Sequence, residues 1–137
     1  MTQVSRSIEL QVSAEQVWDV IGGFQSLADW HPVPQQSIRE DVDGVEHRRL
    51  ELGGDAPAIV EKHLGSDAMS YGYEITDPGP LPVSGYRSIL SVSPTSAGCC
   101  VSWVSTFTPV GDEAGAAAAV AGVYDAGLGA LQERFAV

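Results

Sequence analysis

Residues 99–135 read CCVSWVSTFTPVGDEAGAAAAVAGVYDAGLGALQERF, a strand pattern followed directly by a helix pattern. The first part alternates apolar and polar residues, which predicts a strand over 99–108 with one apolar face. In the second part, large apolar residues recur at offsets of three and four, which is typical of one face of an α-helix that Asp112 caps. A sheet with one apolar face must be covered, and we expect this helix to cover it. The apolar residues on that helical face are Val120, Val123, Tyr124, Leu128, Leu131 and Phe135.

The N-terminal region predicts a strand and then two short helices. Alternation predicts the strand over Ser5–Val12, and a capping box at Ser13–Gln16 opens a helix that Gly22 and Gly23 end. We expect Ser26 to cap a second helical turn before Pro32. Trp18 is expected in the core.

Six further strands are expected as three hairpins. The fold class is therefore α+β, a curved seven-stranded antiparallel sheet around a long C-terminal helix, with two short helices after the first strand. The hairpin strands are predicted at 37–41 and 45–52, at 58–64 and 69–76, and at 83–93 and 99–108, with turns at 43–44, 65–67 and 95–98.

Length and charge restrict the classes of function. The 137 residues predict a single domain over 1–137, and 7 Lys+Arg against 18 Asp+Glu leave a net charge of −11. This charge argues against binding to nucleic acid or to an anionic membrane surface. The chain shows neither a run of 18 apolar residues nor a signal-peptide pattern, and Cys99 and Cys100 are adjacent, so we expect a cytoplasmic protein with reduced thiols.

Four glycines in the predicted C-terminal helix need a physical reason, because glycine in a helix costs about 0.5–1 kcal/mol relative to alanine. Close approach of the helix backbone to a neighbouring element is one explanation. A lack of side-chain volume beneath the sheet is another, and the sequence leaves both open. The glycines are Gly115, Gly122, Gly127 and Gly129.

The order of elements and several short motifs resemble the START-like or SRPBCC superfamily, which includes bacterial polyketide cyclase/dehydrase-type proteins, the major birch pollen allergen and the plant abscisic-acid receptors. This resemblance covers the whole chain and implies a helix-grip fold. It rests on residues 17–21 with Phe24, 29–32, Glu61 before Asp67, 71–75, 80–86, and Trp103 with 107–109.

The resemblance also implies an internal cavity for a small, mostly apolar molecule, between the sheet and the C-terminal helix. Residues 53–58 resemble a gate loop at its mouth, and residues 78–82 lie where a latch loop would be. The implied ligand-binding residues are His31, Glu61, Tyr73, Ile75, Tyr86, Ser88, Trp103, Val120, Tyr124 and Leu128.

His31 and Glu61 each allow two interpretations. His31 could move a proton in a dry cavity, or it could be a structural histidine at the end of a helix. Glu61 could point inward and pair with His31 as an acid–base couple, or it could face solvent in register with His63. The tyrosines favour a cavity with polar points over a filled core, because a buried phenol needs a hydrogen-bond partner.

The remaining patterns for catalysis are missing from the sequence. His31, His47 and His63 lack the spacing of metal ligands, and no nucleophile elbow or phosphate-binding loop is present, so we expect neither a metal nor a cofactor.

Our first hypothesis is a binding protein for a small hydrophobic molecule, such as a polyketide, a lipid fragment or an aromatic metabolite. The alternative is a cofactor-independent polyketide cyclase/dehydratase-like enzyme that uses His31 and Glu61 as acid–base groups, with Tyr86 as a further catalytic candidate. A third hypothesis is a partner-binding protein whose cavity is collapsed.

Overall fold

Seven antiparallel strands form one sheet in the computed structural model, which describes residues 1–136. The strand order is β1-β7-β6-β5-β4-β3-β2, so every neighbouring pair except β1 and β7 is a hairpin or a simple meander connection. The predicted α+β fold class and the seven-stranded sheet are confirmed. The strands are β1 (Thr2–Leu10), β2 (Gln36–Val42), β3 (Val45–Glu51), β4 (Ile59–Asp67), β5 (Ser70–Asp77), β6 (Val83–Pro94) and β7 (Cys99–Pro109).

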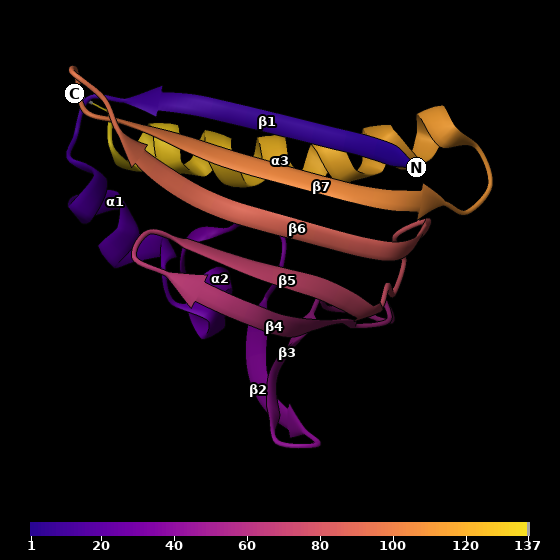
Figure 1. The fold of residues 1–137 in the computed structure, drawn as a ribbon. Helices are drawn as coiled ribbons and strands as arrows, with labels where there is room; N and C mark the ends of the chain where they lie inside the picture. The colour runs from indigo at the N-terminus through magenta and orange to yellow at the C-terminus, as the bar shows by residue number, and fades with distance from the viewer. Residues whose placement is uncertain (137) are drawn as a thin grey trace.

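The long helix α3 (Glu113–Arg134) covers one face of this sheet and runs along β1 and β7 (Figure 1). Two short helices, α1 (Ala14–Ile21) and α2 (Leu27–Trp30), follow β1, with the 3₁₀ turn η1 (Phe24–Ser26) between them. The β2–β3 hairpin projects away from the rest of the sheet in the same view. The chain therefore has a helix-covered inner face and an open outer face.

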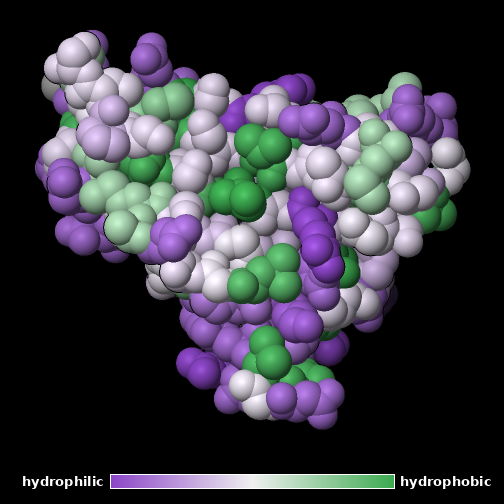
Figure 2. All heavy atoms as spheres, in the orientation of Figure 1, coloured by the Kyte–Doolittle hydropathy of each residue, from purple (hydrophilic) through white to green (hydrophobic). Residues whose placement is uncertain are grey.

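The outer face of the sheet carries little apolar surface. Figure 2 shows its hydrophobic atoms as small, separate groups among polar ones. Leu64 and Ile89 are the large apolar side chains exposed on β4 and β6. This separation agrees with the alternation in the sequence, which puts one face of each strand in water.

The predicted caps of α1 and α3 are confirmed. The Ser13 hydroxyl accepts the Gln16 N–H at 3.2 Å while the Gln16 side chain accepts the Ser13 N–H, also at 3.2 Å. At α3, Asp112 Oδ2 accepts the Gly115 N–H at 2.8 Å. The Ser26 prediction is wrong: its side chain makes no capping hydrogen bond, because the 3₁₀ turn η1 leads directly into α2.

The turn predicted at 65–67 is also wrong. Residues 65–67 lie inside β4, where the pairing with β5 shifts register between His63 and Gly65, and the chain reverses at 68–69 instead. Gly65 has a φ of 135°, so it supplies a β-bulge rather than a turn. The turn at Asp43-Gly44 is confirmed, with both residues at positive φ, as a two-residue hairpin turn requires.

Other boundaries differ slightly from the prediction. The first strand begins and ends earlier than Ser5–Val12, and Trp18 is only partly buried, packing at the edge of the core.

The inner face of α3 packs on the sheet through the residues that its periodicity predicted. Val120, Tyr124, Leu128 and Leu131 are buried, whereas Val123 and Phe135 are partly buried. By length and composition alone this helix could also cross a membrane. Its apolar side is instead the core of this fold, since the sheet covers it.

One of the four helix glycines marks a close approach. A Cβ atom on Gly127 would lie 2.5 Å from His31 Cδ2 and 3.0 Å from Trp103 Cζ3, so only glycine leaves room for the imidazole ring. At Gly122 and Gly129 an added Cβ would meet nothing within 4 Å. Close backbone approach therefore explains Gly127, and the structure gives no steric reason for Gly122 or Gly129.

We predict opposite effects for alanine at these positions. Gly127→Ala should lower the free energy of unfolding by about 1–3 kcal/mol, because the methyl group overpacks against His31 and Trp103. Gly122→Ala and Gly129→Ala should raise it by about 0.5–1 kcal/mol through helix propensity. Urea unfolding of the three variants measures both effects, and equal gains at all three positions would contradict the close approach.

Candidate functional site

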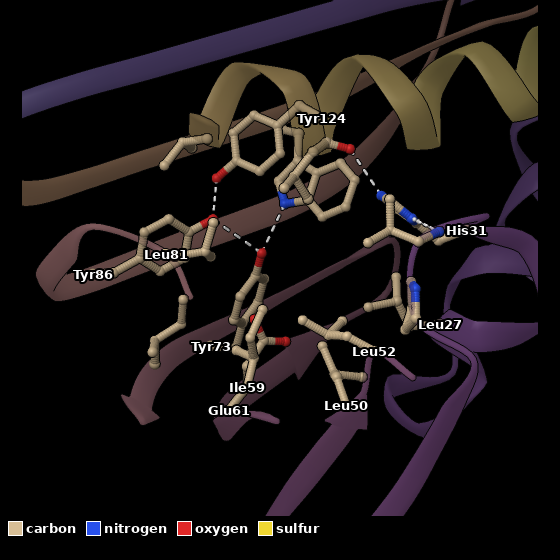
Figure 3. A pocket seen from close by; sticks show the side chains of 16 residues that line it. Leu27, His31, Leu50, Leu52, Ile59, Glu61, Tyr73, Leu81, Tyr86 and Tyr124 are labelled. Atoms are coloured by element: carbon tan, nitrogen blue, oxygen red, sulfur yellow. Dashed lines mark hydrogen bonds between the residues drawn. The ribbon is translucent and has the colours of Figure 1, made fainter. Parts of the chain in front are cut away.

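A largely enclosed cavity lies between the inner face of the sheet and α3 (Figure 3). Eight of the ten predicted ligand-binding residues line it: His31, Glu61, Tyr73, Ile75, Tyr86, Trp103, Val120 and Tyr124. Ser88 and Leu128 are buried but do not line this cavity, and their predicted role in binding a ligand stays a prediction. Ser88 lies behind Tyr124 and bonds to its hydroxyl.

Half of the cavity wall was not identified from the sequence. The eight wall residues that were not predicted give the wall most of its apolar character. They lie in α2, in the loops around the mouth, in β3 and β4, and in α3. They are Leu27, Val33, Pro34, Leu50, Leu52, Ile59, Leu81 and Val123.

The cavity is small. Its volume is about 40 Å³. Since one water needs roughly 10–15 Å³ in this measure, the closed cavity has room for about three waters. A cavity that holds one benzene ring measures about 150 Å³, so this space as it stands is too small for any of the expected ligands.

Arg48 is fully buried beside the cavity and was missed in the sequence. Its Nε donates to Glu61 Oε1 at 2.7 Å, and its Nη1 donates to the Phe24 carbonyl at 2.7 Å and to the Tyr71 hydroxyl at 3.1 Å. The guanidinium also lies 4.2 Å from the centre of the Phe24 ring and 4.9 Å from that of Tyr73. A buried arginine remains protonated, so this group is a fixed positive charge inside the protein.

The sequence gives only a partial signal for Arg48. Arg48 and Arg49 are neighbours on β3, so the two side chains must point to opposite faces of the sheet. Arg48 stands directly opposite Glu61 in the β3–β4 register. Once this register is known, an inward Glu61 implies an inward Arg48 on the adjacent strand, because paired residues share a face.

Glu61 points inward, as one of its two interpretations predicted, but its partner is Arg48. The predicted His31–Glu61 couple does not form. Burial raises the pKa of the Glu61 carboxyl, and the charge and hydrogen bond of Arg48 offset part of that rise. The second carboxylate oxygen makes no hydrogen bond to any of the described residues. It is not one of the fully buried polar atoms that lack a partner among them.

His31 is held by backbone groups at both ring nitrogens. Nε2 donates to the Val123 carbonyl at 2.8 Å, and Nδ1 accepts the Val33 N–H at 3.1 Å. Burial lowers the pKa of the imidazole, although the bond to Val123 opposes this shift. The ring is therefore neutral near pH 7 and ties the α2–β2 loop to α3, which agrees with the structural interpretation rather than the catalytic one.

Three tyrosine hydroxyls form a chain along the cavity (Figure 3), and the Ser88 hydroxyl extends this chain beyond the lining. Trp103 Nε1 donates to the Tyr73 hydroxyl at 3.0 Å, which lies 3.2 Å from the Tyr86 hydroxyl. Tyr86 bonds in turn to Tyr124, and Tyr124 bonds to Ser88 at 3.1 Å. Burial raises the pKa of all three tyrosines, so they remain neutral. The four hydroxyl groups have four protons, and the three hydrogen bonds between them use three of these. One hydroxyl proton is therefore not used within the chain.

The two loops that resemble the gate and the latch touch each other at the mouth. A Cβ on Gly79 would lie 2.9 Å from the Ala58 carbonyl oxygen and 3.0 Å from that of Pro57. Gly53, Gly54 and Gly79 all have positive φ, so the two loops turn at residues that other side chains would strain.

Residues 1–136 match the family described as polyketide cyclase / dehydrase and lipid transport. The chain belongs to this family. It is the SRPBCC grouping that the sequence motifs indicated. The search of curated proteins returned no match.

Several solved structures share this fold. The chain is 35% identical to a putative uncharacterized protein from Bacillus thuringiensis, with a TM-score of 0.86 over 98% of each chain. It is 34% identical to the protein XoxI from Bacillus cereus, with a TM-score of 0.84 over 98% of this chain and 96% of that one. The Zhui aromatase/cyclase from Streptomyces is 15% identical, with a TM-score of 0.64 over 94% and 87% of the chains, and this likeness concerns the fold alone.

We predict that His31 makes the stability of this family member fall in acid. Because burial lowers the pKa of His31, the unfolded chain, with a histidine pKa near 6.5, binds this proton more readily than the folded protein. The contribution of neutral His31 is therefore complete above about pH 6.5 and decreases as the pH falls below it. His31→Gln should remove this part of the slope. Urea unfolding of both proteins over this pH range provides the test, and parallel curves would contradict it.

We also predict strong coupling between Arg48 and Glu61. Arg48→Met alone should cost about 3–5 kcal/mol, because it leaves a buried carboxylate without its partner. Combining it with Glu61→Gln should cost clearly less than the sum of the two single changes. A double-mutant cycle in urea measures the coupling energy, and additive costs would show that the pair is not coupled.

Proposed function

We propose that this protein binds a small, mostly apolar molecule in the cavity between the sheet and α3. The proposal rests on the composition of the cavity wall, in which apolar side chains surround two groups of polar atoms. These are the free oxygen of Glu61 and the hydroxyl chain that ends at Tyr73. Ligand sites commonly combine an apolar lining with a few polar groups that fix orientation.

Binding requires the wall to move, because the closed cavity holds only about three waters. The side chains nearest the loops, Leu52 and Leu81, are partly buried, and Val33 is exposed on its other side. Displacing these three side chains breaks few buried contacts, so the mouth is the part of the wall that opens at the lowest cost in free energy. The family description, which includes lipid transport, agrees with a ligand that enters an internal space.

Catalysis of the cyclase/dehydratase kind is the second candidate, and Glu61 favours it more than His31 does. Both nitrogens of His31 are engaged, whereas Glu61 keeps a free oxygen and has a raised pKa. The hydroxyl groups of Tyr73, Tyr86 and Tyr124 lie in the same wall. A group that accepts a proton and a group that donates one are the parts that enolisation of a ketone needs.

Native mass spectrometry of the purified protein tests binding and separates the two candidates. A co-purified small molecule whose mass and chromatographic retention both stay unchanged during incubation supports binding. Conversion to a different compound supports catalysis, with the mass conserved if a ring only closes and lowered by one water if dehydration follows. An empty protein that also gives no tryptophan-fluorescence response to apolar single-ring molecules would overturn both.

We predict that filling the cavity abolishes binding. Val120→Phe puts a ring into the space that a ligand would occupy, so affinity for any apolar ligand should fall at least about tenfold while the fold persists. Ile89→Phe on the exposed outer face is the matched control and should leave affinity unchanged. Titrations monitored by tryptophan fluorescence, to which Trp103 in the cavity wall contributes, compare the two variants. Equal affinity in both would place the ligand elsewhere.

A further inference from the structure

Each ring nitrogen of His31 has a partner that fixes its role in hydrogen bonding. Nε2 lies 2.8 Å from the Val123 carbonyl oxygen, which can only accept, and Nδ1 lies 3.1 Å from the Val33 backbone nitrogen, whose N–H can only donate. The ring therefore carries its proton on Nε2 and keeps a lone pair on Nδ1. Only the neutral imidazole suits this arrangement, because the imidazolium ion carries a proton on each nitrogen.

The two bonds of His31 join two segments of the cavity wall. Val33 and Pro34, which follow α2, line the cavity together with Val123 of α3. Val33 is 44% exposed, so this segment lies where the wall meets solvent. The ring reaches the helix because Gly127 has no side chain: a Cβ atom there would lie 2.9 Å from Nε2. His31 thus holds the segment with Val33 and Pro34 against α3.

The charged groups around His31 disfavour a proton on Nδ1. Burial lowers the pKa of the imidazole, the hydrogen bond to α3 opposes this shift, and the positive charge of Arg48 on β3 adds to it. Glu61 on β4 lines the same cavity, but its carboxylate already pairs with Arg48. Asp125 on α3 is exposed and pairs with Arg6. Further titratable side chains on the surrounding elements are the exposed Asp29 of α2 and the neutral Tyr73, Tyr86 and Tyr124 of the wall.

We propose, on the basis of the proposed binding function, that protonation of His31 at Nδ1 opens the mouth of the cavity beside Val33 and lets a bound ligand leave. A proton on Nδ1 sets two donors against each other, so the bond to the Val33 N–H is lost. Both donors regain partners in water when residues 31–34 move outward. This movement takes Val33 and Pro34 out of the wall. The site therefore keeps its ligand at neutral pH and releases it in mild acid.

Nuclear magnetic resonance of the ¹⁵N-labelled protein tests the opening without a ligand. Between about pH 7.5 and about pH 5, the His31 ring nitrogens should change from the neutral form protonated on Nε2 to the imidazolium. The Val33 amide should shift with the same midpoint and lose its protection from hydrogen exchange. The Gln35 amide, which donates to the Glu51 carbonyl at 2.8 Å, is the control and should stay protected. A ring that stays neutral, or a Val33 amide that stays protected while the ring titrates, would overturn the proposal.

Release is measured with para-fluorotoluene, a neutral single-ring probe, by fluorine resonance of its exchange between the free and bound forms. In the wild-type protein the dissociation rate constant should rise at least about fivefold from about pH 7.5 to about pH 5, because the open form binds the proton more readily than the closed form. His31→Asn should hold this rate constant within about twofold, because asparagine can accept the N–H two residues further on and does not titrate. His63→Asn changes a histidine of β4 that lies outside the cavity lining, and it should retain the acid effect.

The outcomes distinguish this inference from the function on which it rests. An equal acid effect in His31→Asn would overturn the proposal and assign the effect to another group, such as Glu61, whose pKa burial raises. A wild-type rate constant that does not change with pH would also overturn it, and binding would stand. If His31→Asn does not fold, the wild-type release curve and the Val33 titration decide, since they must share one midpoint. If neither para-fluorotoluene nor a larger apolar molecule binds at neutral pH, the proposed binding function fails, and the Val33 amide still shows whether the mouth opens.

Discussion

A guanidinium shut off from solvent determines what the interior of this protein can hold. Arg48 carries its charge into the space between the sheet and the short helices, where a single carboxylate, a backbone carbonyl and the faces of aromatic rings surround it. Because removing a charge from water costs several kcal/mol, Glu61 must remain inside with it. Glu61 consequently lines the cavity as its carboxylate, with one oxygen not bonded to Arg48.

The fold was predictable because each strand and helix carries its own periodicity. Alternation along β6 and β7, the 3.6-residue pattern of α3 and the caps at Ser13 and Asp112 each act over a few residues, so one sequence contains them. The error at 65–67 has the same local origin: a glycine serves a turn and a bulge equally well, and only pairing with β5 decides between them.

The site was predictable as a list of wall residues but not as a set of interactions. His31 was expected in the wall, yet its partner Val123 lies on α3, and no local pattern connects residues so distant in sequence. Arg48 was missed because β3 is rich in charged residues and resembles a solvated strand until its register against Glu61 is known. The width of the cavity depends on how closely α3 approaches at Gly127, which composition alone does not fix.

The contact between the two mouth loops has a kinetic consequence. Gly79 packs against the carbonyl groups of Pro57 and Ala58, so neither loop can swing outward without losing its contact with the other. For the ligand proposed above, entry and departure between these loops would share one gating event, and the speed of that event would limit both rates. The ligand would then associate more slowly than diffusion allows, and it would dissociate correspondingly slowly. Slow dissociation suits a molecule that is scarce or reactive in free solution.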